Sequence, residues 1–203
     1  HVLDKLTYST YIRSNVGLKA ARISPHYFEV VSNAQNEVDL QVGFGQNTPV
    51  SFAQARETNR KAYVNYWNSG GMIDFGNVKD PRAKELERRM ILSMYLTKIQ
   101  STGTEPPQET GLTYNSWYGR PHLEMTWWHV MHFGYWGKAD LLAKSLPWYM
   151  KNFKEAKALA RRQGFSGVRW QKMTDPDGGE SPSSVGSFLL WQQPHIIDML
   201  DLI

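Results

Sequence analysis

Residues 106 to 136 decide how the chain folds, and they read PPQETGLTYNSWYGRPHLEMTWWHVMHFGYW. The part up to Gly119 is rich in Pro, Gly and Asn, residues that favour turns, so it predicts a loop. Pro121 suits the first position of a helix, and no helix breaker follows it until Gly134. The sequence therefore predicts a long loop that leads into an aromatic helix over residues 121–136.

Aromatic and acidic side chains gather where this loop meets the helix. Trp117, His122, Glu124 and Trp128 all fall near the expected first turns. Flat indole rings suit the C–H faces of a sugar, and fixed carboxylates and amides suit its hydroxyl groups. The stretch therefore indicates a sugar pocket, and ordinary core packing of the aromatic rings is the alternative that the residues leave open.

The composition excludes several classes of protein. The chain has 203 residues, no Cys and a net charge of +4, with Lys and Arg scattered among Asp and Glu. A nucleic-acid surface needs a basic patch, and only short basic runs on one expected helix occur, so nucleic acid is not expected as a partner. The lack of Cys excludes disulfides and zinc–thiolate sites. No apolar run approaches the roughly 20 residues of a membrane span, so no membrane partner is expected either.

The first fifty residues predict β-structure. Residues 7–13, 27–31 and 38–42 are rich in β-branched and aromatic residues. Val38, Leu40 and Val42 alternate with polar residues, which is typical of a half-buried strand. Three strands make an incomplete sheet with exposed edges, so we expect the chain to be a fragment in which further β-structure precedes residue 1.

The rest of the chain predicts helices. They are expected over residues 52–68, 81–103, 121–136, from Lys138 or Asp140 to 164, and 188–203. Ser51 and Asp80 are expected N-caps, and Pro147 is expected to kink or restart its helix. A loop of about twenty residues from Phe165 separates the last two helices, and loops of that length in compact domains tend to be functional. The fold class is therefore mainly α with an N-terminal β segment.

From Phe52 to Ile203 the sequence resembles the six-hairpin, or (α/α)6-toroid, glycosidases. PPQETGLTYNSW followed by HLEMTWW looks like a loop and helix of the inverting α-L-fucosidase family. There the pattern is Pro-x-Asn-Leu-Gln-Gly, a Trp-Asn, and then Asn-x-Asn-Leu-Gln-Met-Asn-x-Trp. GFSGVRWQKMT followed by Gly-Gly-Glu is similar to a loop of the maltose and trehalose phosphorylases. The resemblance covers about three quarters of the chain, and where the fucosidases carry two water-holding Asn residues this chain has Arg120 and His122.

The resemblance implies a domain plan and a reaction. Residues 1–50 would be the C-terminal part of a β-sandwich, 51–79 a linker helix and loop, and 80–203 the first hairpins of a partial toroid. The reaction would be inverting hydrolysis of a glycosidic bond in an oligo- or polysaccharide, with no cofactor. The general acid and base would lie after the segment that matches Gln192 to Leu202, beyond Ile203. A periplasmic or secreted location is implied, while a cytoplasmic location and any oligomeric state stay open.

Glu124 and Glu180 are the candidate catalytic carboxylates within the chain. A carboxyl group among aromatic rings suits general-acid work, and an inverting pair would stand about 6.5–9.5 Å apart. Hydrogen bonding to sugar and structural capping are the alternatives for both. The candidate substrate-binding residues are Asn115, Trp117, His122, Trp128, Arg169, Lys172, Gln192, Gln193 and His195.

No metal site is predicted. His129 and His132 share a helix, but no His-Glu-x-x-His motif or third ligand accompanies them, so we interpret both as core or hydrogen-bonded residues. Two alternatives to hydrolysis remain. One is a phosphorylase of the same fold, with phosphate in place of water, and the other is a non-catalytic carbohydrate-binding or helical scaffold protein.

Overall fold

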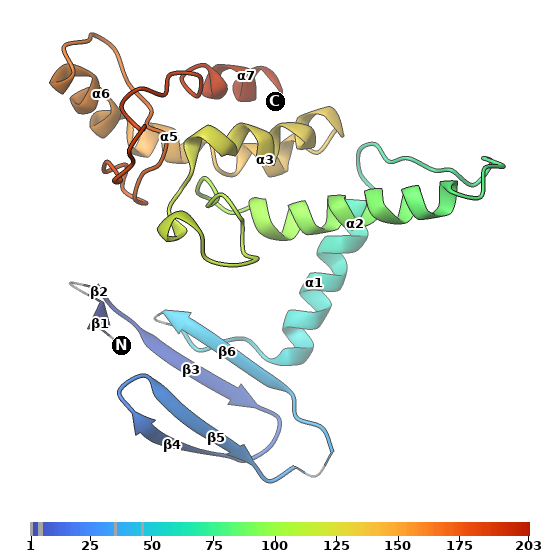
Figure 1. Cartoon of the computed structure of the whole chain (residues 1–203). Coiled ribbons are helices and arrows are strands. Elements are labelled where there is room, and N and C mark those ends of the chain that lie inside the picture. The colour runs from blue at the N-terminus through green and yellow to red at the C-terminus, as the bar shows by residue number, and fades with distance from the viewer. Residues whose placement is uncertain (1, 4–5, 35, 46) are drawn as a thin grey trace. The chain divides into compact units, whose positions relative to one another are not determined.

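The computed structural model describes residues 2–3, 6–34, 36–45 and 47–203 (Figure 1). The chain divides into two compact units, His1–Asn68 and Ser69–Ile203. The first contains short antiparallel strands and one helix, and the second is helical with long loops. The protein is thus helix-rich with a small N-terminal β segment, as the sequence predicts.

Within its described residues, the β segment contains three two-stranded antiparallel sheets. The strands are β1 (Val2–Leu3), β2 (Leu6–Thr7), β3 (Ser9–Ser14), β4 (Leu18–Ser24), β5 (Tyr27–Ser32) and β6 (Leu40–Gly45). The sheets pair β1 with β2, β3 with β6, and β4 with β5. In the β3–β6 sheet, Ser9 lies opposite Gly45 and Ser14 opposite Leu40. The register of β4 and β5 shifts between Arg22 and Ser24, which marks a bulge near the hairpin turn.

In this segment the sequence prediction misses one strand and is wrong about the burial of another. β4 was not predicted, because its Lys, Ala and Arg residues have weak β propensity and its pairing with β5 decides its structure. The alternation in β6 was expected to bury Leu40 and Val42, yet these side chains are 47% and 46% exposed. A two-stranded ribbon provides no second layer to cover that face.

Helix α1 (Phe52–Trp67) confirms its sequence prediction. The Ser51 hydroxyl accepts a hydrogen bond from the Gln54 N–H, and the Gln54 side chain accepts one from the Ser51 N–H, which forms a capping box. Helix α2 (Ala83–Ser101) begins two residues later than predicted. The Asp80 carboxylate accepts hydrogen bonds from the backbone and guanidinium of Arg82, so it stabilises the turn before the helix.

Helix α3 (Leu123–Tyr135) forms the centre of the second unit. Its Leu123, Val130 and Phe133 are almost completely buried, and so are Leu142 and Met199. Leu142 belongs to α4 (Ala139–Ala143) and Met199 to α7 (His195–Asp201), and both helices pack on α3. Figure 1 shows α3 and α7 running side by side. The core therefore fixes α3, whose N-terminus receives the long loop of residues 106–122.

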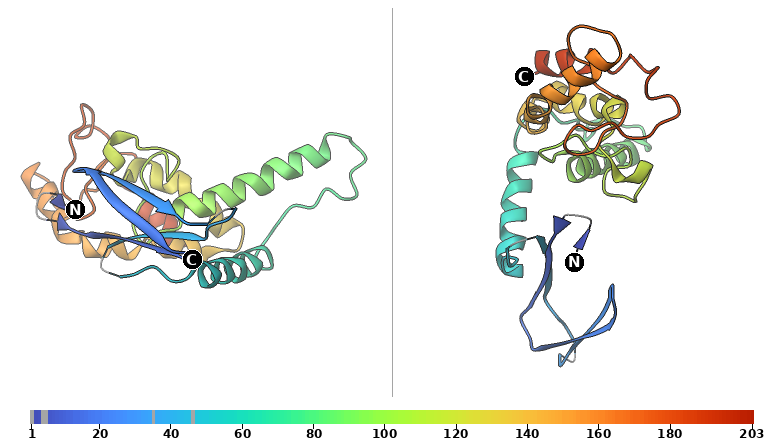
Figure 2. Two further views of the ribbon diagram at one scale, coloured as in Figure 1. Left: turned by 90° about the horizontal axis from the view of Figure 1, so that it is seen from below. Right: turned by 90° about the vertical axis from the view of Figure 1, so that its left-hand side faces the viewer.

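The remaining helices are shorter than the sequence predicts. The helix expected up to residue 164 is divided into α4, α5 (Pro147–Lys151) and α6 (Phe153–Arg162), and Pro147 starts α5 as the sequence predicts. The helix expected from residue 188 begins only at His195. The Gln193 side chain bonds the backbone of Trp170, which holds residues 191–194 in turns. The long loop between α6 and α7 can be followed in Figure 2.

Candidate functional site

The loop before α3 is fixed by close packing on α2 and by local hydrogen bonds. Gly111 has a φ of 58°, and a Cβ atom there would lie 2.6 Å from the Cβ of Gln100 on α2, so no other residue fits without displacement. The Thr110 hydroxyl donates to the Tyr114 carbonyl at 2.6 Å and lies 3.0 Å from the Ser116 hydroxyl. These contacts form the turn that leads to Trp117.

Two residues of this loop have left-handed backbone conformations. Trp117 has a φ of 48° and Tyr118 a φ of 64°, and bulky residues rarely adopt either value. Such conformations cost on the order of 1–2 kcal/mol per residue and persist where the surroundings enforce them, often at functional sites. The Trp117 indole meets the ring of His122, the residue before α3, and Trp117 is about half exposed.

A short backbone pairing connects the loop, α3 and the segment of Lys172. His122 and Met173 form an isolated antiparallel β-bridge, and the Glu124 N–H donates a hydrogen bond to the Lys172 carbonyl at 3.3 Å. The His122 N–H donates to the Pro107 carbonyl at 3.1 Å. Three segments that are distant in sequence thereby meet at the first turn of α3.

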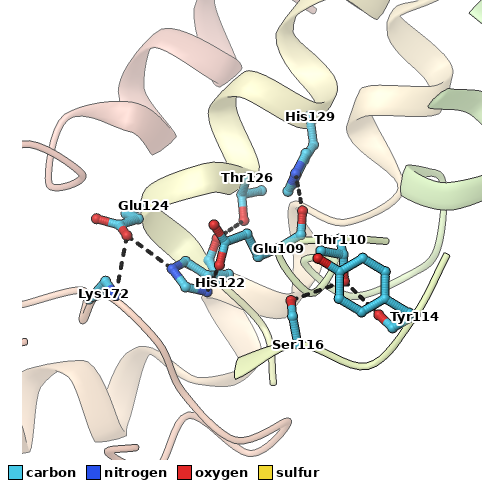
Figure 3. Close-up of polar contacts among 9 residues, drawn as sticks. All are labelled: Glu109, Thr110, Tyr114, Ser116, His122, Glu124, Thr126, His129 and Lys172. Atoms are coloured by element: carbon cyan, nitrogen blue, oxygen red, sulfur yellow. Dashed lines mark hydrogen bonds and ion pairs between the residues drawn. The ribbon is translucent and has the colours of Figure 1, made fainter. Parts of the chain in front are cut away.

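The side chains at this junction form a charged cluster, which we call the Glu124 cluster: Glu109, Trp117, His122, Glu124 and Lys172. Figure 3 shows the side chains of this cluster except Trp117. The Glu124 Oε1 lies 3.0 Å from the Nε2 of His122 and 3.4 Å from the Nζ of Lys172. The Lys172 Nζ lies 4.2 Å from the centre of the Trp117 ring, within cation–π distance. The Trp117 and His122 rings meet edge to face at 6.0 Å.

Burial makes these contacts strong. The side chains of His122, Lys172 and Glu124 are only 1%, 7% and 15% exposed. Both contacts of Glu124 fall on Oε1, and its Oε2 has no hydrogen-bond partner in the part of the chain that the structure describes. The cluster thus offers a free carboxylate oxygen beside a half-exposed indole, and this combination can hold a sugar ring and its hydroxyl groups.

Four of the predicted site residues belong to this cluster, and others do not. Glu180 is exposed, and its carboxylate pairs with the guanidinium of Arg162 on α6. Trp128 lines a hollow of about 370 Å³ between α2 and α3, together with His132 and Trp136. Asn115 is exposed in the loop. Their roles as catalytic or sugar-binding residues stay predictions.

The remaining predicted residues make contacts within the chain. Arg169 donates to the carbonyls of Ser187 and Leu189, and Gln192 donates to those of Trp170 and Leu189. Gln193 bonds both backbone groups of Trp170. These polar groups therefore stabilise the long loop.

His195 is buried and stacks on the Trp127 ring at 5.7 Å. Burial lowers the pKa of His195, while a hydrogen bond to the Leu123 backbone and the charges of Asp198 and Glu124 oppose this shift. Burial also lowers the pKa values of His129 and His132. We therefore interpret all three as neutral imidazoles at pH 7.

Sequence reasoning did not single out Glu109. Its backbone carbonyl lies 3.0 Å from the Nε2 of His129, and its Oε2 lies 3.9 Å from the Nδ1 of His122. The only signal in the sequence is its place in the aromatic loop, because its approach to His122 depends on how the loop folds back. Across the residues that the structure describes, no group of three or more His, Asp or Glu side chains could hold a metal ion.

No protein-family model, curated protein or solved structure matches the chain. None of the described helices combines the length and the apolar character that crossing a membrane requires.

Proposed function

We propose that the chain forms part of the sugar-binding cleft of an inverting glycoside hydrolase of the six-hairpin type, acting on an oligo- or polysaccharide. The observation that supports this proposal is the Glu124 cluster, where a largely buried carboxylate with one free oxygen and a half-exposed indole both contact Lys172. Residues 80–203 would be the first hairpins of the (α/α)6 toroid, as the resemblance implies.

In this proposal the side chains of the cluster other than Glu109 contact the sugar or orient the carboxylate. The Trp117 ring packs on the C–H face of a sugar, and its strained backbone fixes the direction of the ring. The His122 and Lys172 donors hold the Glu124 Oε1, so Glu124 acts as an acceptor and is suited to be the base-side carboxylate. An inverting enzyme also needs a general acid. The resemblance implies that both the acid and the base lie after the segment that matches Gln192 to Leu202, so the proposal of Glu124 as the base departs from the resemblance.

Turnover of defined oligosaccharides tests this function. A form of the chain that continues beyond Ile203, and so includes the general acid that the resemblance implies, is incubated with a panel of α- and β-linked glucose, galactose and fucose disaccharides, and the anomeric protons of the products are followed by ¹H NMR. We expect one disaccharide to yield the inverted anomer first, and Glu124→Gln to slow its release by at least about 100-fold. Asp177→Asn, which changes a carboxylate that is 87% exposed, is the matched control. A sugar 1-phosphate that forms only in phosphate buffer would indicate the phosphorylase instead.

A non-catalytic sugar-binding role is the second candidate. It is favoured by Glu180, whose carboxylate pairs with Arg162 and not with the Glu124 cluster. A wild-type chain, continued beyond Ile203, that binds a glycan without any turnover would support this candidate. A chain that neither binds nor cleaves any sugar of the panel would contradict both.

A further inference from the structure

We propose that Glu109 and His122 form a paired acceptor site for a group that donates two protons, either a water molecule or the amino group of an amino sugar. The amino-sugar source rests on the proposed sugar-binding function, whereas the water source does not. The site lies next to Glu124, on the opposite nitrogen of the same imidazole.

The first argument is the proton on His122. Its Nε2 contacts the Glu124 Oε1, which also receives the Lys172 ammonium, so this oxygen is an acceptor and the proton belongs on Nε2. In the neutral imidazole the other nitrogen, Nδ1, then carries only a lone pair. The Nδ1 of His122 is therefore an acceptor that points toward Glu109.

The second argument is that both acceptors are buried and unpaired. The Nδ1 of His122 and the Oε2 of Glu109 have no hydrogen-bond partner among the residues that the structure describes. Buried polar atoms of this kind nearly always have a partner in native proteins, and an ordered water molecule or a ligand is the usual one. The two atoms lie 3.9 Å apart, too far for a direct hydrogen bond and close enough for one small donor to reach both.

The chemistry of the pair selects its occupant. Two facing acceptors cannot both be satisfied by a single hydroxyl group, which has one proton to donate. Water donates two protons, and a protonated amine donates up to three and also complements the charge of Glu109. The site therefore discriminates an amino group from a hydroxyl group at the same position of a sugar ring.

A hollow leads from solvent to the Glu109 side of the site. Glu109 lines a hollow of about 220 Å³ between α2 and the loop, together with His129, Thr110 and Thr97. The Glu109 side chain is 32% exposed, although its Oε2 is buried. A small polar molecule can thus approach Glu109 from this side, while His122 stays sealed beneath.

Two measurements on the whole chain test the proposal. Isothermal titration compares D-glucosamine with D-glucose, and we expect wild type to bind glucosamine about tenfold more tightly, or about 1.4 kcal/mol. Glu109→Gln should abolish this preference because it removes the negative charge. Glu109→Asp should abolish it because the shorter side chain moves the carboxylate away from His122. Asp177→Asn should keep it. Circular dichroism verifies that each variant is folded.

The second measurement is a crystal structure of the sugar-free chain at a resolution that orders water. We expect a water molecule within hydrogen-bond distance of both the His122 Nδ1 and the Glu109 Oε2. If neither sugar binds, the amino-sugar source is excluded, the sugar function is judged separately on the disaccharide panel, and the water alone then decides this inference. A direct contact between the two side chains, or a dry gap, together with equal binding of the two sugars, would overturn it.

Discussion

Removing either charge of the Glu124–Lys172 pair should destabilise the chain far more than removing a surface charge. Both side chains are nearly buried, and the charged atoms are 3.4 Å apart. Loss of one member of a buried pair costs roughly 3–5 kcal/mol, because the other charge is left without compensation. Glu124→Gln can keep the hydrogen bond from His122 and so should cost about 3 kcal/mol. Lys172→Met also loses the cation–π contact with Trp117 and should cost about as much.

The double variant measures the coupling directly. When both charges are removed, no buried charge is left unpaired. The double variant should therefore lose about 2 kcal/mol less of the free energy of unfolding than the two single variants lose together. Urea denaturation followed by tryptophan fluorescence suits this measurement, because seven of the eight Trp residues lie in the unit that contains the pair. The matched control is the pair of Lys151 and Asp177, which has a similar distance of 3.3 Å but is 57% and 87% exposed. Its coupling should stay below about 0.5 kcal/mol. Equal coupling in both pairs would refute the reasoning that burial makes the Glu124 cluster strong.

Three further predictions concern other parts of the chain. Burial lowers the pKa values of His129, His132 and His195 below 6.5, so the unfolded chain binds more protons than the folded chain as pH falls, and stability is lost below about pH 6.5. The melting temperature should therefore be lower at pH 5.5 than at pH 7.5. A higher melting temperature at pH 5.5 would contradict the assigned burial. Gly111→Ala should cost clearly more than Gly164→Ala in urea denaturation, because a Cβ at Gly111 meets Gln100 at 2.6 Å whereas nothing lies within 4 Å at Gly164, although both have positive φ. Ser51→Ala should cost about 1 kcal/mol of α1 stability, seen as faster amide exchange in its first turn, and unchanged exchange would show that the capping box contributes nothing.

The sequence predicted the elements whose signals are local. The Ser51 capping box and the restart at Pro147 depend on a few neighbouring residues, and both are where the sequence places them. β4 and the late start of α7 were missed because distant partners decide them. β4 forms through its pairing with β5, and Gln193 is held by the Trp170 backbone, 23 residues away.

In the candidate site, too, local sequence patterns indicate the residues, while contacts between distant segments bring them together. Trp117, His122, Glu124 and Lys172 were all selected from residue type and spacing, yet only the antiparallel bridge between His122 and Met173 brings Lys172 beside Glu124. Glu109 was missed because no periodic pattern indicates that the loop folds back over His122. Glu180 follows a Gly-rich turn that suggests a ligand loop, but a long-range partner, Arg162, takes its carboxylate.

The most direct test of the central claim is a glycan array probed with three forms of the chain: wild type, Trp117→Ala and Asp177→Asn. If the Glu124 cluster binds a saccharide on the Trp117 ring, wild type and Asp177→Asn will bind the same glycans and Trp117→Ala will lose them. Binding that persists unchanged in Trp117→Ala, or no glycan bound by wild type, would contradict the account.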